Sequence, residues 1–254
     1  MTAYSNNKVF SESQRDIPKG GNIVLTAFFN SAVDPQRNIK WTADIDLITG
    51  LSKSCEVNNE NIIIFHDCFS PEQIQKIQSS RVFFYKVKFD TNYSPNVFRY
   101  LIMYDFLIQH TYDKVFIVDS YDVIMQFSPF AEMLDGFIYC GDEAGKITGL
   151  DWMRETQEPY LKIPDYRKII ENHADKRLLN CGLVGCYYND MLKLLSLWTD
   201  IFKNSISDTH AATDMATFNY IIRKYYQGRF SHGIHVNTGF KLNKENNISW
   251  WKHK

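Results

Sequence analysis

The stretch Val115-Phe116-Ile117-Val118-Asp119-Ser120-Tyr121-Asp122-Val123-Ile124 decides the fold expected for this 254-residue chain. Its first four residues are β-branched or aromatic, which favours a strand buried on both faces. Asp119 and Asp122 follow at the carboxyl end of that strand. In open α/β sheets ligands bind at this end of the strands, so two carboxylates here could hold Mg²⁺ or Mn²⁺ against a diphosphate. A turn closed by Asp and Ser side chains is the alternative for the same residues.

Composition and length favour one domain and restrict the classes of partner. No Pro-, Gly- or Ser-rich stretch divides the chain, so we interpret residues 1–20 as a polar N-terminal segment and 21–254 as a single domain. Lys and Arg number 28 and Asp and Glu 29. This balance gives no electrostatic reason to expect nucleic acid or an anionic membrane as a partner.

The sequence also bears on the expected cellular location. Residues 1–20 lack the continuous apolar core of a signal peptide, and we expect no transmembrane segment. The five cysteines are an odd number and lie mostly in apolar segments, which indicates reduced, structural thiols. These features predict a cytoplasmic protein. The last residues, 250–254, are expected to dock on the domain.

Strand and helix signals alternate along the chain from residue 22 onward. Apolar runs predict strands over 22–29, 61–66, 81–89, 115–118, 137–140 and 178–187. Amphipathic spacing predicts helices over 42–51, 97–108, 191–202 and 214–226. A further helix should begin at Ser70-Pro71-Glu72-Gln73, which fits a capping box with proline at the first helical position. The alternation predicts an α/β protein with a central mixed, mostly parallel sheet flanked by helices.

Three later motifs carry polar groups and follow the acid pair in a particular order. Asn180 stands at a strand edge two residues before Gly182, where the absent side chain lets the backbone pass close to a ligand. Asp214 begins the last helix, near its positive end. His232, His235 and Asn237 follow as candidate neutral ligands. Segment 146–175 has weak periodicity and predicts a surface excursion that could hold an acceptor.

With these motifs in place, the chain resembles metal-dependent glycosyltransferases of the GT-A (Rossmann-like) fold over residues 22 to 241. The Asp-Ser-Tyr-Asp phrase at 119–122 is especially similar to the glycosyltransferase domain of the procollagen lysyl hydroxylase family. That family has an Asn-Ser-Gly-type strand next, matched here by Asn180 and Gly182. It then has an acid at a helix start, matched by Asp214.

The resemblance implies a Mn²⁺ (or Mg²⁺) site and a UDP-sugar donor. Asp119, Asp122 and His235 would hold the metal ion, with Ser120 and Gly182 beside the nucleotide. Arg99 is expected near the phosphates. The end of the first strand, at residues 26–28 (Thr26, Ala27 and Phe28), is expected near the base and ribose. For those three side chains an ordinary core strand is the alternative.

The chemistry follows from charge on the leaving group. A divalent cation stabilises the diphosphate more as the sugar bond breaks, which favours transfer of the sugar. The resemblance implies a hexose, glucose or galactose, as that sugar, and the acceptor would be a hydroxyl of a protein or glycan. Asn180 and Asp214 would position the reactants, and Glu143 or Asp142 is the candidate base. Family members of the retaining type have Gln after the helix-start acid, where this chain has Met215. Retention or inversion therefore stays open.

Three other classes of protein compete with this interpretation. A phosphatase of the haloacid dehalogenase type also ends a strand in two acids, but these are two residues apart, not three. A sugar nucleotidyltransferase needs a Gly-rich basic loop after its first strand, and residues 30–37 contain no Gly. A catalytically silent relative would bind a nucleotide or glycan with the same acids and would not turn over.

Overall fold

The computed structural model describes residues 10–13, 16–34, 38–147, 160, 163–206, 214–242 and 244–253. Its strands are β1 (Phe10–Ser13), β2 (Asn22–Phe28), β3 (Ile62–His66), β4 (Val82–Val87), β5 (Lys114–Val118), β6 (Val123–Met125), β7 (Ile138–Lys146), β8 (Arg177–Tyr187), β9 (Phe230–His232) and β10 (Trp251–His253). Its helices are α1 (Asp46–Val57), α2 (Pro71–Gln75), α3 (Pro95–Leu107), α5 (Tyr166–Asn172), α6 (Tyr188–Asp200), a π-helical turn (Ile201–Ser205) and α7 (Asp214–Tyr225).

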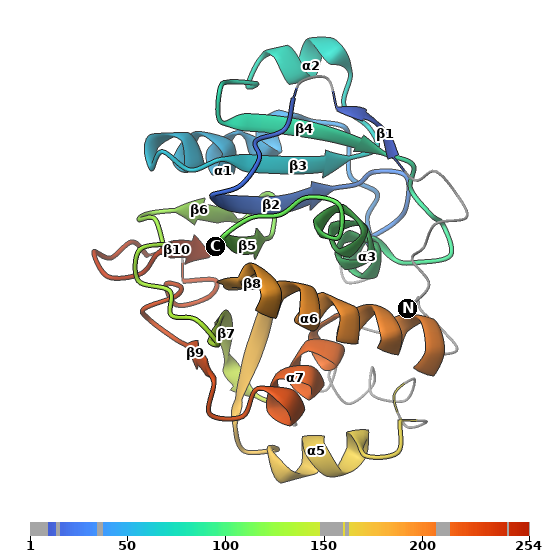
Figure 1. Cartoon of the computed structure of the whole chain (residues 1–254), viewed down its shortest axis with the longest axis vertical. Coiled ribbons are helices and arrows are strands. Elements are labelled where there is room, and N and C mark those ends of the chain that lie inside the picture. The colour runs from blue at the N-terminus through green and yellow to red at the C-terminus, as the bar shows by residue number, and fades with distance from the viewer. Residues whose placement is uncertain are drawn as a thin grey trace.

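The described strands form one large mixed sheet and one small sheet (Figure 1). The large sheet has the order β1-β4-β3-β2-β5-β8-β7-β9, and β10 pairs with β6 in the small one. Strands β4, β3, β2 and β5 are parallel, whereas β8 runs antiparallel to both of its neighbours, β5 and β7. The expected α/β class with a mixed sheet flanked by helices is confirmed, and the arrangement is compatible with a Rossmann-like fold.

Alternate residues of the central strands pack on opposite faces of the sheet. In β5, Val115 and Ile117 join a core cluster with residues of α3, α6 and α7. Phe116 and Val118 join a second cluster with residues of α1, α2, β6 and β10. Both faces of β5 are therefore buried, as its run of β-branched and aromatic residues predicts. Its carboxyl end is the point from which Asp119 leaves the sheet.

Local signals place several elements where the sequence predicts them. The Ser70 hydroxyl accepts from the Gln73 N–H, and the Gln73 side chain accepts from the Ser70 N–H, so the capping box is confirmed. Helix α1 begins later than expected, at Asp46, and runs on to Val57. Strand β7 is longer than expected, because its polar half, through Asp142 and Glu143 to Lys146, still pairs with β8.

Other expectations concern the ends and the excursion. Trp250 and Trp251 are buried, which confirms that the last residues dock on the fold. All five cysteines are free, as expected. Of the predicted excursion over 146–175, residues 148–159 and 161–162 lie outside the described residues, as does most of segment 1–20. Among the helices that the structure describes, none combines the length and hydropathy that a membrane span requires.

Candidate metal centre

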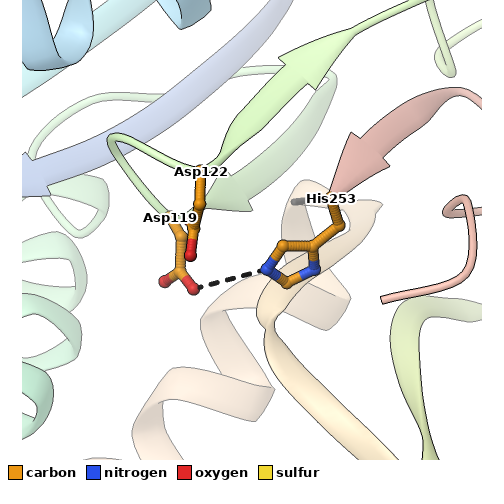
Figure 2. A group of neighbouring side chains, drawn as sticks. All are labelled: Asp119, Asp122 and His253. Carbon is orange, nitrogen blue, oxygen red and sulfur yellow. Dashed lines mark ion pairs between the residues drawn. The ribbon is translucent and has the colours of Figure 1, made fainter. Parts of the chain in front are cut away.

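Two acids and a histidine converge where β5 ends. Asp119 directly follows β5, and Asp122 directly precedes β6. Strand β10 runs antiparallel to β6, with His253 opposite Val123, the residue after Asp122. This pairing brings the histidine from the end of the chain to the two carboxylates, and Figure 2 shows the three side chains facing one another.

The geometry of this group suits a metal ion. One potential ligand atom from each of Asp119, Asp122 and His253 lies within 4.8 Å of the others. The His253 Nε2 atom is 3.9 Å from Asp119 Oδ2. His253 is fully buried, and neither of its ring nitrogens has a hydrogen-bond partner among the described residues. Buried polar groups almost always have a hydrogen-bond partner or a comparable ligand, so the two ring nitrogens of His253 indicate that this site binds a further group.

The protonation state of the histidine fits the same role. Burial lowers the pKa of His253 to about 4, against an opposing effect of the Asp119 charge. The imidazole is therefore neutral at neutral pH and keeps a lone pair for a cation. Two carboxylates and one neutral imidazole nitrogen together fit a divalent cation.

The late ligand preferred from the sequence, His235, does not lie in this group. Its side chain is 42% exposed, and its Nε2 atom is 3.3 Å from Glu132 Oε2. Its ring packs edge-on against Trp250. The structure brings His253 to the acids in its place. Only a long-range pairing of two three-residue strands reveals this, and such short strands carry no periodic signal in the sequence.

The Asn-x-Gly motif supports the first acid. The Asp119 N–H donates to the Gly182 carbonyl at 2.7 Å. A Cβ atom at Gly182 would lie 2.7 Å from Asp119 Cγ and closer still to Oδ2, so only glycine leaves room for this carboxylate. The Asn180 side chain accepts from the Gly182 N–H at 2.7 Å. The Asn-x-Gly motif therefore lies against Asp119.

Glu143, the candidate base, contacts the Asn-x-Gly motif through Asn180. Its Oε1 atom accepts from the Asn180 amide at 2.9 Å. Burial raises the pKa of Glu143, while the Asn180 hydrogen bond and the charge of Lys241 oppose the rise. The charge of Asp119 raises this pKa further, which shows that the two carboxylates are electrostatically coupled.

The neighbouring acid, Asp142, has different partners. Its Oδ2 atom is 2.9 Å from His232 Nδ1 and 3.1 Å from Arg177 Nε. Burial opposes its ionisation, but the hydrogen bonds and charges of His232 and Arg177 outweigh burial and lower the pKa of Asp142. Asp142 is thus held ionised in an ion-pair cluster, and Glu143 is the better candidate for accepting a proton.

Arg99 connects the metal centre with the last helix. Its guanidinium donates to Asp119 and, at 2.7 Å, to Asp214 Oδ2. Burial raises the pKa of Asp214, and the charge of Arg99 opposes that rise. The sequence predicts Arg99 beside nucleotide phosphates, whereas here it lies between two carboxylates. It offsets part of the negative charge that these acids place in one small region.

The predicted nucleotide residues at the end of β2 mostly serve the core. The Thr26 hydroxyl donates to the Val118 carbonyl at 2.9 Å, and Phe28 stacks on Phe69. Ala27 is half-buried and Ser120 is buried. The side chains of Thr26 and Phe28 thus match the core-strand alternative.

An aromatic pair beside the acids was not predicted. The rings of Trp41 and Tyr121 lie 4.8 Å apart between centroids, tilted by 42°. Tyr121 stands within the acid motif itself, between Asp119 and Asp122. The position of Tyr121 between the two acids could have indicated a role in the site. The chain contains so many aromatic residues that this one did not stand out.

Comparison with models of known protein families found no match, and comparison with curated proteins found none either. The function proposed below therefore depends on the residues of this chain and their geometry.

Proposed function

We propose that the protein is a metal-dependent glycosyltransferase of the GT-A fold. It would move a hexose, glucose or galactose, from a UDP-sugar to a hydroxyl of a protein or glycan. The observation that carries the proposal is the convergence of Asp119, Asp122 and a buried His253 at the carboxyl end of a central strand, the His253 ring nitrogens having no hydrogen-bond partner among the described residues. In α/β sheets this end is where nucleotide ligands bind.

The metal centre would serve the leaving group. Asp119, Asp122 and His253 would hold Mn²⁺ or Mg²⁺, and the bound cation would supply charge stabilisation to the departing diphosphate. Arg99 and Gly182 would keep the Asp119 carboxylate in place, the first by hydrogen bonding and the second by leaving room. The chain's own contribution is a fixed arrangement of ligands, so little reorganisation is needed at the moment of reaction.

Groups around the acids would bind the rest of the donor. The Trp41 and Tyr121 rings offer an apolar surface for a nucleobase. Lys241 influences the pKa values of both Glu143 and His253, so its charge lies close to the centre and would face a diphosphate. These contacts are consistent with a nucleoside diphosphate ligand.

The acceptor would meet Glu143 and Asn180. Burial raises the pKa of Glu143 toward the range in which a carboxylate accepts a proton from a hydroxyl and later releases it. Asn180 fixes the Glu143 carboxylate through its amide and so limits the directions from which a hydroxyl can approach. Asp214, anchored by Arg99, would complete the polar wall of the sugar site.

The test is metal-dependent release of UDP. The protein is incubated with UDP-glucose or UDP-galactose without an acceptor, with Mn²⁺ or with EDTA, and free UDP is measured over hours. Slow release that needs Mn²⁺ and is lost in D122N supports the proposal. Binding of UDP with Mn²⁺ but no release from any UDP-sugar, with or without candidate acceptors, would instead indicate a silent nucleotide-binding relative.

A further inference from the structure

The proposed metal histidine lies in a three-residue strand near the end of the chain, and hydrogen bonds with Val236 and Thr238 hold this strand on the side away from β6. The His253 N–H donates to the Thr238 hydroxyl at 3.1 Å. The Thr238 N–H donates to the Trp251 carbonyl at 2.9 Å. Thr238 is 1% exposed and His253 is 0% exposed, so water does not replace these bonds. The Trp251 N–H also donates to the Val236 carbonyl at 3.0 Å. Thr238 bonds to the backbone of His253 itself and so helps to set the position of this residue relative to the acids.

The residue before it, Asn237, ties the same loop to β7. Its Oδ1 atom accepts from the Asp142 N–H at 3.2 Å, and its amide donates to the Asp142 carbonyl at 3.4 Å. The amide also donates to the Thr238 carbonyl at 2.8 Å. Because Glu143 follows Asp142 directly, Asn237 and Thr238 join the strand of the candidate base to the strand of the candidate metal ligand. We call these two residues the clamp.

We propose that the clamp is a positioning element for the metal centre and that Thr238 holds His253 in register with Val123, next to Asp122. This inference rests on the proposed metal centre. Metal ligation tolerates ligand displacements of only about 0.2 Å, and outer contacts of ligands commonly govern metal affinity. The His253 imidazole has no hydrogen-bond partner of its own among the described residues. Its ring packs edge-on against Phe240, with 4.5 Å between the ring centroids, and the backbone that carries it donates on this side to the Thr238 hydroxyl. The position of the imidazole therefore depends in part on Thr238.

The experiment compares Thr238 variants by their affinity for Mn²⁺ alone, measured from the electron paramagnetic resonance signal of free Mn²⁺. T238V keeps the shape of the side chain and removes the acceptor, whereas T238S keeps the hydroxyl. T217V is the matched control, because Thr217 is equally buried and its hydroxyl bonds to Tyr160 at 2.9 Å, away from β10. Melting temperatures of all variants are recorded to separate metal affinity from stability.

We expect T238V to bind Mn²⁺ about tenfold more weakly than wild type, which is the smallest loss of affinity usual when a contact that supports a metal ligand is removed. T238S and T217V should bind Mn²⁺ about as tightly as wild type. If T238V does not fold, T238A is measured in its place with the same expectation. Wild-type affinity in T238V, or T238A in its place, together with weak binding in H253A, would overturn the clamp and leave the metal centre intact. Wild-type affinity in H253A would overturn both.

Discussion

Replacing Gly182 with alanine should strongly weaken metal binding while the sheet stays folded. The new Cβ atom would lie 2.7 Å from Asp119 Cγ, whereas ordinary contact begins at 3.4 Å. The carboxylate carbon would have to retreat by about 0.7 Å, and Oδ2, which faces His253, by more. A displacement approaching 1 Å in a positioned group costs on the order of 100-fold, and we expect that loss in Mn²⁺ affinity. Overpacking should cost about 1–3 kcal/mol of unfolding free energy.

Gly185 in the same strand provides the matched control for this variant. A Cβ atom there would lie 2.8 Å from Phe116 Cγ and closer to other ring atoms, so G185A overpacks the core and not the metal centre. Mn²⁺ titration and circular dichroism of both variants below their melting temperatures separate the two effects. G185A should lose stability and keep its Mn²⁺ affinity. Wild-type Mn²⁺ affinity in G182A would refute the assignment of Asp119 as a ligand.

Three further predictions concern other parts of the molecule. D122N should weaken Mn²⁺-dependent UDP binding by at least about tenfold with an unchanged circular dichroism spectrum, and unchanged calorimetric affinity would exclude Asp122 as a ligand. N180A should lower UDP-sugar turnover, and it should cost about 1–3 kcal/mol of unfolding free energy because it leaves the Gly182 N–H unpaired. A change in melting temperature without a change in turnover would make Asn180 purely structural. Burial lowers the pKa of His66 to about 4, from an ordinary value of 6.5. As pH falls from 6.5, the unfolded chain therefore binds the extra proton before the native state does. The unfolding free energy should drop by roughly 3 kcal/mol by pH 4. H66N, whose amide oxygen can replace the Nδ1 acceptor for the Phe69 N–H, should flatten this part of the denaturation profile, and an identical profile would contradict the assignment.

The sequence predicts the parallel half of the sheet well because local chemistry and burial agree there. Residues 62–65 of β3 and 115–118 of β5 are β-branched or aromatic and are buried, so their composition and their environment coincide. The start of α2 follows from its capping box, which involves only neighbours in the chain. Asp119 meets Gly182 because β8 runs antiparallel to β5 and continues past the end of β5.

The remaining features depend on contacts between distant segments. His253 reaches Asp119 only because β10 pairs with β6, more than a hundred residues earlier in the chain. Neither three-residue strand has a length or an alternation that distinguishes it from a loop. Likewise the polar half of β7 is a strand because β8 offers it partners, not because Asp142 and Glu143 favour that conformation.

The most direct test of the central claim is the thermal stability of the protein with UDP, in the presence and absence of Mn²⁺. A ligand at a concentration of 100 times its Kd stabilises the native state by about 2.7 kcal/mol, which for a chain of this length raises the melting temperature by roughly 5–10 °C. We predict that UDP produces this shift only with Mn²⁺ and that D122N abolishes it. An equal shift without Mn²⁺, or no shift with UDP or any UDP-sugar, would contradict a metal-dependent UDP-sugar site.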